Sequence, residues 1–400
     1  MRELKVNELT RGSKLMNILR KSLPEAKDSF FYKMLRKKNI TLNGKKATGS
    51  EIVSEGDVIK FFLSDETYDK FAGISRKATE KETGDTFGSM NGGMCLNGEC
   101  VFENEKYSEI KTGLNVKSSD ENGKTGFKNT PIKESEKRHF QINKKDIIYE
   151  DRDIILINKP YGVLSQKAAV DDYSMVEALY DYMSYTGQLS QNDIFRPAVT
   201  NRLDRNTTGI IAGGKTTSGL QYLSNAQKKG SVKKYYICIV AGEMKDTRLL
   251  NGLWSKNTRN NKVTIDMVEN VPNSYSFPSK YWIKGNVPVQ TLVAPVITNG
   301  RYTAVKIGLL TGKSHQIRAH MKSYGFPLIG DYKYGQKSMN DYFTAKYGLK
   351  SQLLHAYVMN IEGMGEYVAE LPEQFIKILK GEGLYSDSIE ELYVNTELRP

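Results

Sequence analysis

The spacing of apolar side chains over residues 12–38 predicts two short helices. Apolar residues recur at helical intervals over residues 12–23, and Pro24 marks the end of that helix because proline cannot continue it. A second helix is expected to follow, with Asp28 or Ser29 as its N-cap, because a short polar side chain there satisfies free backbone N–H groups. Its apolar positions are expected to face a core while its lysines and arginines face outward.

Two strands are predicted beyond these helices. Residues 40–42 alternate as a strand, Asn43-Gly44 is a tight-turn signal, and an apolar strand follows over residues 58–63. Together, the helices and strands predict a small N-terminal α/β domain over residues 1–66.

The hydrophobic periodicity stops over residues 67–138, where Gly, Ser, Asn, Lys and Glu dominate. We interpret this stretch as an irregular linker or insertion. Cys95 and Cys100 lie inside it without a second cysteine pair, so a zinc site is not expected there. With Cys238 the chain has three cysteines, an odd number that gives no disulfide framework.

Strand and helix signals alternate again over residues 139–390, which we expect to form one larger domain. An apolar strand at residues 154–157 ends in Asn-Lys-Pro. Further along, the alternation of a second strand places Tyr236, Cys238 and Val240 on one face. Neither strand on its own indicates a function.

A polar turn and a helix start in this domain hold the candidate functional side chains. The turn carries Arg202 and Asp204 ahead of an apolar run, and the hydroxyls of Thr207 and Thr208 are expected to tie it to nearby backbone groups. The helix start has several polar residues in the sequence TGKSHQIRAH. An aspartate in a polar turn is by itself more often a cap or salt-bridge partner than a catalyst, so its context decides.

Charge adds to this picture because it is concentrated at one end of the chain. The formal net charge is +12, and residues 1–50 contain thirteen Lys or Arg against four Asp or Glu. Such a patch suits a polyanionic partner such as RNA. We expect it to bind RNA through Lys33, Arg36, Lys37, Lys38 and Lys45.

No targeting or membrane segment is expected. No stretch approaches twenty consecutive apolar residues, and the polar N-terminus lacks the apolar middle region of a signal peptide. The sequence therefore predicts a cytoplasmic protein.

The N-terminal segments KNITLNGKKA and EGDVIKFF resemble the RNA-binding domain first described in ribosomal protein S-four. The resemblance covers residues 10–65 and implies an RNA-binding unit of two helices and a hairpin. The alternative is a small surface domain whose basic helix simply faces water.

Segments of the larger domain resemble the RluA-type pseudouridine synthases. The family's motifs stand here as NKPYG, NRLDRNTTG, KYYICIVAG, TGKSHQIRAH and PLIGDYKYG. The resemblance covers residues 146–362. It implies an α+β chain whose catalytic domain has a largely antiparallel mixed β-sheet flanked by helices and loops, and an enzyme that isomerises uridine in RNA without a cofactor.

The same resemblance assigns catalytic roles position by position. It carries the family's catalytic aspartate to Asp204, its active-site tyrosine to Tyr236 and its aspartate-pairing arginine to Arg318. A carboxylate suits the reaction as a nucleophile toward the ribose or the uracil ring, or as an acid-base group. These three routes remain open from the sequence. Tyr236 is expected to stack on the uracil rather than transfer a proton, because a phenol is a weak base.

RNA contacts in the catalytic domain are expected from three side chains. Arg202 matches the family's arginine that fills the space left by an extruded base. Lys313 and His315 lie in the helix-start motif. Asn201 replaces the family's usual histidine, which is expected to alter RNA contacts without removing a group from the chemistry.

Two other functional classes are disfavoured. Residues 209–216 match the phosphate-loop pattern G-x-x-x-x-G-K-T, but a polar turn precedes them where such a loop needs a strand. His315 and His320 are five positions apart, about 140° around a helix, so they do not share the face that a metal site needs. We expect no metal.

The resemblance favours large-subunit ribosomal RNA as the substrate, because an N-terminal domain of this type accompanies members with that target. A pseudouridine synthase acting on tRNA, and a non-catalytic RNA-binding or ribosome-assembly factor, remain the alternatives. A monomer is the default expectation.

Overall fold

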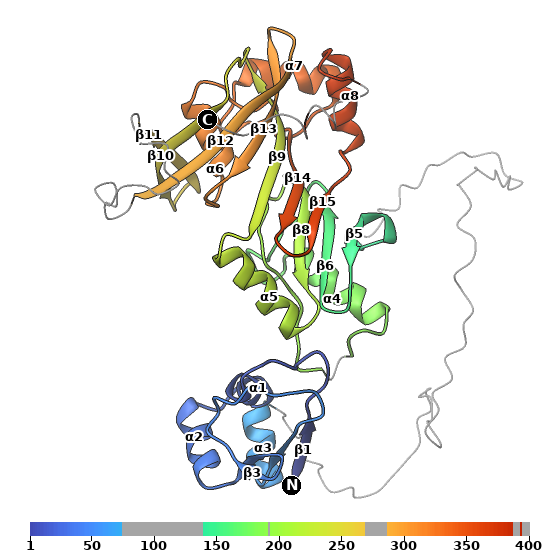
Figure 1. Ribbon diagram of the computed structural model, residues 1–400, viewed down its shortest axis with the longest axis vertical. Helices are drawn as coiled ribbons and strands as arrows, with labels where there is room; N and C mark the ends of the chain where they lie inside the picture. The colour runs from blue at the N-terminus through green and yellow to red at the C-terminus, as the bar shows by residue number, and fades with distance from the viewer. Residues whose placement is uncertain (74–138, 191–192, 269–285, 387–392, 394–400) are drawn as a thin grey trace, which may run out of the picture. The chain divides into compact units, whose positions relative to one another are not determined.

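The computed structural model describes residues 1–73, 139–190, 193–268, 286–386 and 393 (Figure 1). Most of the segment predicted to be an irregular linker or insertion, including Cys95 and Cys100, lies outside these residues. The described residues before and after that segment form one compact unit. Among them, no helix is long and apolar enough to cross a membrane.

The N-terminal part is a small antiparallel sheet covered by helices. Its strands stand in the order β1-β4-β2-β3, and the helices α1, α2 and α3 close one core over it. The strands are β1 (Arg2–Lys5), β2 (Ile40–Leu42), β3 (Lys45–Lys46) and β4 (Val58–Phe61), and the helices are α1 (Leu15–Ser22), α2 (Asp28–Arg36) and α3 (Asp65–Ala72).

Both predicted helices and the predicted hairpin are present here, but the predicted cap of α2 is wrong. The N-cap is Lys27, which makes no side-chain cap bond. The Asp28 carboxylate instead accepts two hydrogen bonds from Arg20, at 2.9 and 2.7 Å, so it is not free to cap. The edge strand β1 and helix α3 were not predicted, and α3 crosses the predicted domain boundary at residue 66.

The larger part is built on a mixed sheet that has eleven strands within the described residues. Its main path runs β11-β10-β12-β13-β9-β14-β8-β6-β5, with β15 on β14 and β7 on β8. The strands are β5 (Ile147–Glu150), β6 (Ile154–Lys159), β7 (Ala198–Val199), β8 (Thr208–Gly214), β9 (Val232–Ala241), β10 (Arg248–Asn257), β11 (Lys262–Met267), β12 (Val287–Thr298), β13 (Tyr302–Leu309), β14 (Leu354–Ile361) and β15 (Gly365–Val368).

The sheet has two halves, and β14 joins them because it lies between β9 and β8 (Figure 1). On one side of β14 is the antiparallel series that starts with β9, and on the other are β8, β6 and β5. The pairing of β14 with β8 is parallel, whereas the other paired strands in the described residues are antiparallel. The largely antiparallel mixed sheet expected from the family resemblance is therefore confirmed.

The strands β8 and β14 approach each other very closely. Gly209 of β8 has φ +104°, and a Cβ atom built there would lie 2.2 Å from the backbone oxygen of Ala356 in β14. Only glycine fits, both because its φ is in the left-handed range and because no side chain has room. The segment that formally matches a phosphate loop thus lies mainly in β8, a buried strand.

Helices cover this sheet. Helices α4 and α5 follow the strands of the half that contains β8, and α6 packs against β10, β11 and β12. Helix α8 and part of α7 contribute to the core beside β9 and β13. The helices are α4 (Met175–Tyr185), α5 (Thr217–Lys228), α6 (Gln316–Ser323), α7 (Lys337–Tyr347) and α8 (Glu373–Gly381), with the short 3-10 helix η1 (Lys144–Asp146) before β5.

Hydrogen bonds connect the N-terminal part of the described residues to the larger part. The guanidinium of Arg11 donates to both carboxylate oxygens of Asp153, at 3.1 and 2.9 Å. The backbone N–H of Thr217, at the start of α5, donates to the carbonyl of Leu9 at 3.0 Å. These bonds connect the segment between β1 and α1 with the start of β6 and with α5.

Candidate active site

Asp204 lies on a loop between β7 and β8 that its surroundings hold firmly. The Ser165 hydroxyl accepts from the N–H of Leu203 at 2.9 Å and donates to the Leu203 carbonyl at 2.8 Å. The ammonium of Lys159 donates to the carbonyl of Arg205 at 3.0 Å. The backbone is therefore fixed on both sides of Asp204, so its carboxylate is presented in one place.

Lys159 is fully buried at the end of β6, and its ammonium holds the backbone of this loop. Its Nζ also donates to the carbonyls of Pro160 and Val163, at 2.9 and 2.8 Å. Burial lowers the pKa of Lys159 to about 7, and the nearby charge of Asp204 acts in the opposite direction. Three carbonyl acceptors match the three hydrogens of the ammonium form.

The threonines of this loop act differently from the prediction. The Thr208 hydroxyl bonds to Nδ1 of His355 at 2.7 Å, and the Thr207 hydroxyl accepts from the side-chain amide of Gln352 at 3.4 Å. Both partners are side chains, so the predicted hydroxyl-to-backbone bonds are wrong. The reason is the parallel strand β14, which brings these partners next to β8 from far along the chain.

Asn201 is buried and braces the same loop. Its side-chain N–H donates to the carbonyl of Ile210 at 3.0 Å, and its side-chain oxygen accepts from the N–H of Ala212 at 2.7 Å. Both polar atoms of the amide are thus hydrogen-bonded to the backbone of β8. This is a structural role that the sequence comparison with the family's histidine did not predict.

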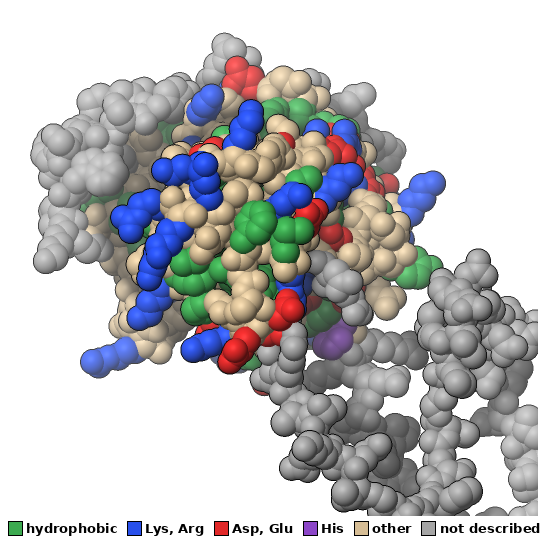
Figure 2. Space-filling model, turned by 90° about the horizontal axis from the view of Figure 1, so that it is seen from below, with side chains coloured by type: hydrophobic (Ala, Val, Ile, Leu, Met, Phe, Trp, Pro, Cys, Tyr) green, Lys and Arg blue, Asp and Glu red, His purple; other side chains and the backbone are tan. Residues whose placement is uncertain are grey.

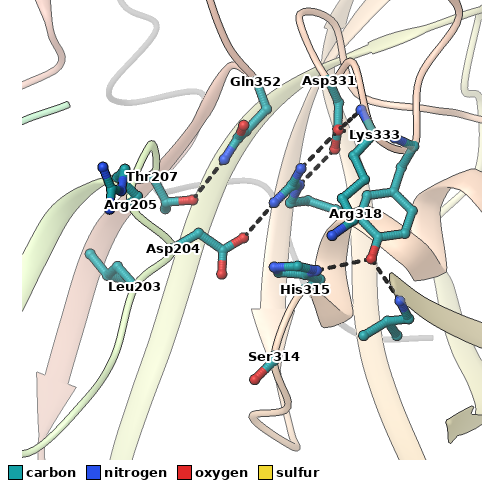
Figure 3. Close-up of polar contacts among 12 residues, drawn as sticks. Leu203, Asp204, Arg205, Thr207, Ser314, His315, Arg318, Asp331, Lys333 and Gln352 are labelled. Carbon is teal, nitrogen blue, oxygen red and sulfur yellow. Dashed lines mark hydrogen bonds and ion pairs between the residues drawn. The ribbon is translucent and has the colours of Figure 1, made fainter. Parts of the chain in front are cut away.

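Arg318 links Asp204 to a second carboxylate (Figure 3). Its Nη1 donates to Asp204 Oδ2 at 2.8 Å, while Nε and Nη2 donate to the two oxygens of Asp331 at 2.7 and 2.9 Å. The Arg318 side chain is 10% exposed and that of Asp331 is 0% exposed. The predicted pairing of Arg318 with Asp204 is therefore present in the structure.

The bidentate contact with Asp331 fixes the plane of the guanidinium. Burial opposes the charge of Arg318, but the hydrogen bonds and charges of Asp331 and Asp204 outweigh it and hold the pKa of Arg318 above its usual value. The backbone N–H groups of Lys333 and Tyr334 both donate to Asp331 Oδ1 at 3.0 Å. Arg318 is thus a permanent cation beside Asp204.

Tyr236 faces the same site from the middle of β9. Its side chain is 5% exposed, and it lines the cavity that holds Asp204. Burial, followed by the charge of Asp204, raises the pKa of Tyr236 above its usual value. The phenol is therefore neutral at ordinary pH.

His315 stands at the N-cap of α6 with a left-handed φ of 54°. Its Nδ1 is 2.9 Å from the hydroxyl of Tyr334, which itself accepts from the N–H of Val263 at 2.9 Å. Because the Tyr334 hydroxyl already accepts one bond, we assign it as the donor to His315 Nδ1. The hydrogen of the neutral imidazole is then on Nε2. Burial lowers the pKa of His315, which favours this neutral form.

A cavity of about 880 Å³ opens over these residues. Among the described residues that line it, Asp204 is the single carboxylate. The cations around it come from several elements: Lys167, Arg202, Arg205, Lys234, Lys256, Lys313, Arg318 and Lys333. A concave cavity with this lining suits an anionic ligand.

The structure brings together only some of the residues predicted from the sequence. Asp204, Tyr236, Arg318, Arg202, Lys313 and His315 all line the cavity. The predicted contacts Lys33, Arg36, Lys37, Lys38 and Lys45 are exposed on the N-terminal part and do not line it. Figure 2 shows Lys and Arg side chains gathered along one side of the face seen from below.

Sequence reasoning missed Asp331, Lys159 and Lys234. Asp331 and Lys159 lie within the motifs PLIGDYKYG and NKPYG, so their position was noticed while their role was not. Lys234 is the first residue of the motif KYYICIVAG. A buried charged residue has no distinctive local signal, because its partners come from distant parts of the chain.

Comparison with known proteins finds a family model that matches the part of the chain around this site. Residues 153–323, which include Asp204, Tyr236 and Arg318, match the family model described as RNA pseudouridylate synthase. Residues 153–323 of this chain are therefore similar to RNA pseudouridylate synthases.

The chain is similar to individual proteins as well. The chain is 29% identical over 239 residues to ribosomal large subunit pseudouridine synthase D of Borreliella burgdorferi, across 58% of this chain and 67% of that one. It is 29% identical over 211 residues to ribosomal large subunit pseudouridine synthase C of Vibrio vulnificus, across 52% and 59%. A solved structure, human RNA pseudouridylate synthase domain containing 4, aligns over 60% of this chain and 93% of its own, with 20% identity and a TM-score of 0.48.

Proposed function

We propose that this protein converts specific uridines of RNA to pseudouridine, with Asp204 as the reacting carboxylate. The observation that carries the proposal is the charge arrangement of the cavity. Asp204 is the single carboxylate among the described lining residues, it is held by Arg318, and the other charged lining residues are cations. A polyanionic substrate that enters this cavity thus meets a single carboxylate, that of Asp204.

The reaction needs only what this site offers. The bond between uracil N1 and ribose C1′ breaks, the uracil turns, and a bond forms between C5 and C1′. The C5 hydrogen leaves as a proton, and N1 ends with a hydrogen. No electrons are gained or lost overall, so the reaction requires no redox group.

Asp204 supports each of the three chemical routes as an ionised carboxylate. It attacks C1′, attacks the uracil ring, or acts as an acid-base group at the ribose. Arg318 keeps this carboxylate charged and oriented through the 2.8 Å bond. Tyr236, neutral and nearly buried, offers the ring face against which the freed uracil stacks while it turns.

RNA contacts extend outward from this centre. A uridine inside a stacked strand has to be flipped out, at a cost of a few kcal/mol. Arg202, exposed at the rim of the cavity, is the side chain we assign to the vacated space. Lys313 and the Nε2–H of His315 are the polar groups assigned to the RNA on the opposite side, at the start of α6.

Large-subunit ribosomal RNA is the substrate we propose. Support comes from the relatives named ribosomal large subunit pseudouridine synthase and from the exposed basic face of α2, which attracts phosphates without reading sequence. The assignment of the N-terminal part as an RNA-binding domain similar to that of protein S-four belongs to this proposal. So do the cytoplasmic location and the monomeric state predicted from the sequence.

A pseudouridine map of total RNA tests the proposal. Cells that lack the protein are complemented with the wild type or with Asp204→Asn, which keeps the size of the side chain and removes its charge. We expect specific sites in large-subunit ribosomal RNA to be lost and to return with the wild type alone. If pseudouridines of tRNA were lost instead, the substrate would be tRNA and not large-subunit ribosomal RNA. Equal restoration by Asp204→Asn would overturn the role of Asp204.

A further inference from the structure

One cation that lines the cavity, Lys234, has no role in the reaction proposed for Asp204. Of the eight cations that line the cavity, Lys167, Arg202, Arg205, Lys256 and Lys313 are exposed. Arg318, Lys333 and Lys234 are buried or half-buried, so their charges are the ones that burial makes costly unless they are paired.

Two of these three have oxygen partners within the chain. Arg318 bonds to two carboxylates, and the ammonium of Lys333 donates to the carbonyl of Asn261. The side chain of Lys234 has no hydrogen bond or ion pair with any residue that the structure describes. Burial lowers the pKa of Lys234, and no nearby carboxylate raises it. Its charge thus faces the cavity without compensation.

The position of Lys234 relative to Tyr236 is fixed by β9. Successive side chains of a strand point to opposite faces, so Lys234 and Tyr236 share one face, about 7 Å apart along the strand. Their register partners, Met359 and Ala356, lie on β14, where the pairing shifts register between Ala356 and Val358. Lys234 and Tyr236 both line the cavity. Lys233 alternates to the other face and is exposed.

This spacing matches the geometry of a nucleotide. With the uracil at Asp204 and Tyr236, a group two strand positions away lies at the distance from a base to a phosphate of its own or the adjoining nucleotide. An ammonium is a compact charge suited to phosphate, and its interaction is strengthened where the surroundings exclude water.

We propose that Lys234 binds a backbone phosphate of the RNA next to the uridine held at Asp204. Lys234 is a binding residue in this scheme and takes no part in bond breaking. The inference rests on the proposed function, since it takes RNA as the substrate. It adds the place in the cavity where the polynucleotide chain enters.

The test compares Lys234→Gln with Lys233→Gln, which removes the same charge one position away on the other face of β9. An in vitro transcript of large-subunit ribosomal RNA is the probe. Equilibrium binding and initial rates of pseudouridine formation are measured over a series of salt concentrations. Lys234→Arg serves as the conservative variant.

For Lys234→Gln we expect kcat/KM to fall about tenfold through KM, with kcat at saturating RNA changed less than about twofold. The slope of log binding constant against log salt should become shallower by about 0.7 to 0.9, the change expected for one lost phosphate contact. Lys234→Arg should keep most of the affinity, and Lys233→Gln should behave as the wild type. Thermal stability of Lys234→Gln should be equal to or above that of the wild type, because an uncompensated charge is removed.

Two results would overturn the inference. One is an unchanged salt slope in Lys234→Gln, and the other is a fall in kcat at constant KM, which would place Lys234 in the chemistry. Failure of the proposed function looks different, because then the wild-type protein forms no pseudouridine even where Lys234 still contributes to the salt slope of binding.

Discussion

At the scale of single residues, the site is a chain of charges in which each member holds the next. Asp331 is fully buried and orients Arg318, and Arg318 in turn orients Asp204. Asp331 does not itself line the cavity, whereas Arg318 does. Its effect on the reaction therefore passes through the arginine, which makes it a positioning residue.

We expect Asp331→Asn to destabilise the fold as well as the site. Removing one partner of a buried ion pair leaves the other charge uncompensated, which typically costs about 3 kcal/mol. Urea unfolding should show this loss in the free energy of unfolding. Asp341→Asn is the matched control, because Asp341 pairs with Lys337 on the exposed face of α7 and should change stability by less than about 0.5 kcal/mol.

Activity separates positioning from stability in the same variant. At a temperature where Asp331→Asn is still folded, kcat should fall at least about tenfold, because the guanidinium loses the contact that sets its plane. Full kcat in the folded variant would mean that Arg318 stays in place without Asp331.

At the scale of elements, the sequence predicted what is local and missed what joins distant segments. The turn before β8 and the face of β9 with Tyr236 and Cys238 follow from short-range alternation, and both are confirmed. The insertion of β14 between β9 and β8 was not predicted, because parallel pairing leaves no mark in the neighbouring sequence. For the same reason the partners of Thr207 and Thr208 were wrong, while the motif resemblance still located Asp204 and Arg318.

His355 on β14 makes this junction sensitive to acid. Burial lowers the pKa of His355 to about 4, below its usual value near 6.5. Between these values the unfolded chain binds a proton that the folded chain does not, so the free energy of unfolding falls as pH drops from about 6.5 to 4. Above pH 6.5 both states are neutral and the histidine adds no pH dependence.

Urea unfolding at several pH values should therefore show a shallower acid slope for His355→Gln than for the wild type. The difference should approach about 1 kcal/mol per pH unit within this window. His139→Gln is the control, because His139 is exposed. Equal slopes in His355→Gln and the wild type would show that His355 takes up its proton equally well in both states.

At the scale of the whole molecule, positive charge occurs in two places with different tasks. The exposed cations of α2 lie on the N-terminal part, while the cavity cations surround Asp204. We expect the first group to govern affinity for RNA and the second to govern the place where the uridine is held.

Neutralising Lys33, Arg36 and Lys37 together by Gln should raise KM about tenfold or more and leave kcat unchanged. The salt slope of RNA binding should become shallower by about 2, since three cations are lost. The matched control changes Lys337, Lys377 and Lys380 on α7 and α8 to Gln, which removes the same charge from other exposed positions. Equal effects of both triples would mean that net charge alone matters, and that α2 has no special part.

The late position of β14 in the chain also sets an order of events during protein synthesis. The basic N-terminal part precedes Asp204 and Arg318 in the chain, and the strand that unites the two halves of the sheet begins only at Leu354. A growing chain thus contains its basic N-terminal part well before the loop of Asp204 and the helix of Arg318 are joined through a common sheet. The two halves of the sheet can therefore be joined only after Leu354 and the rest of β14 have been made.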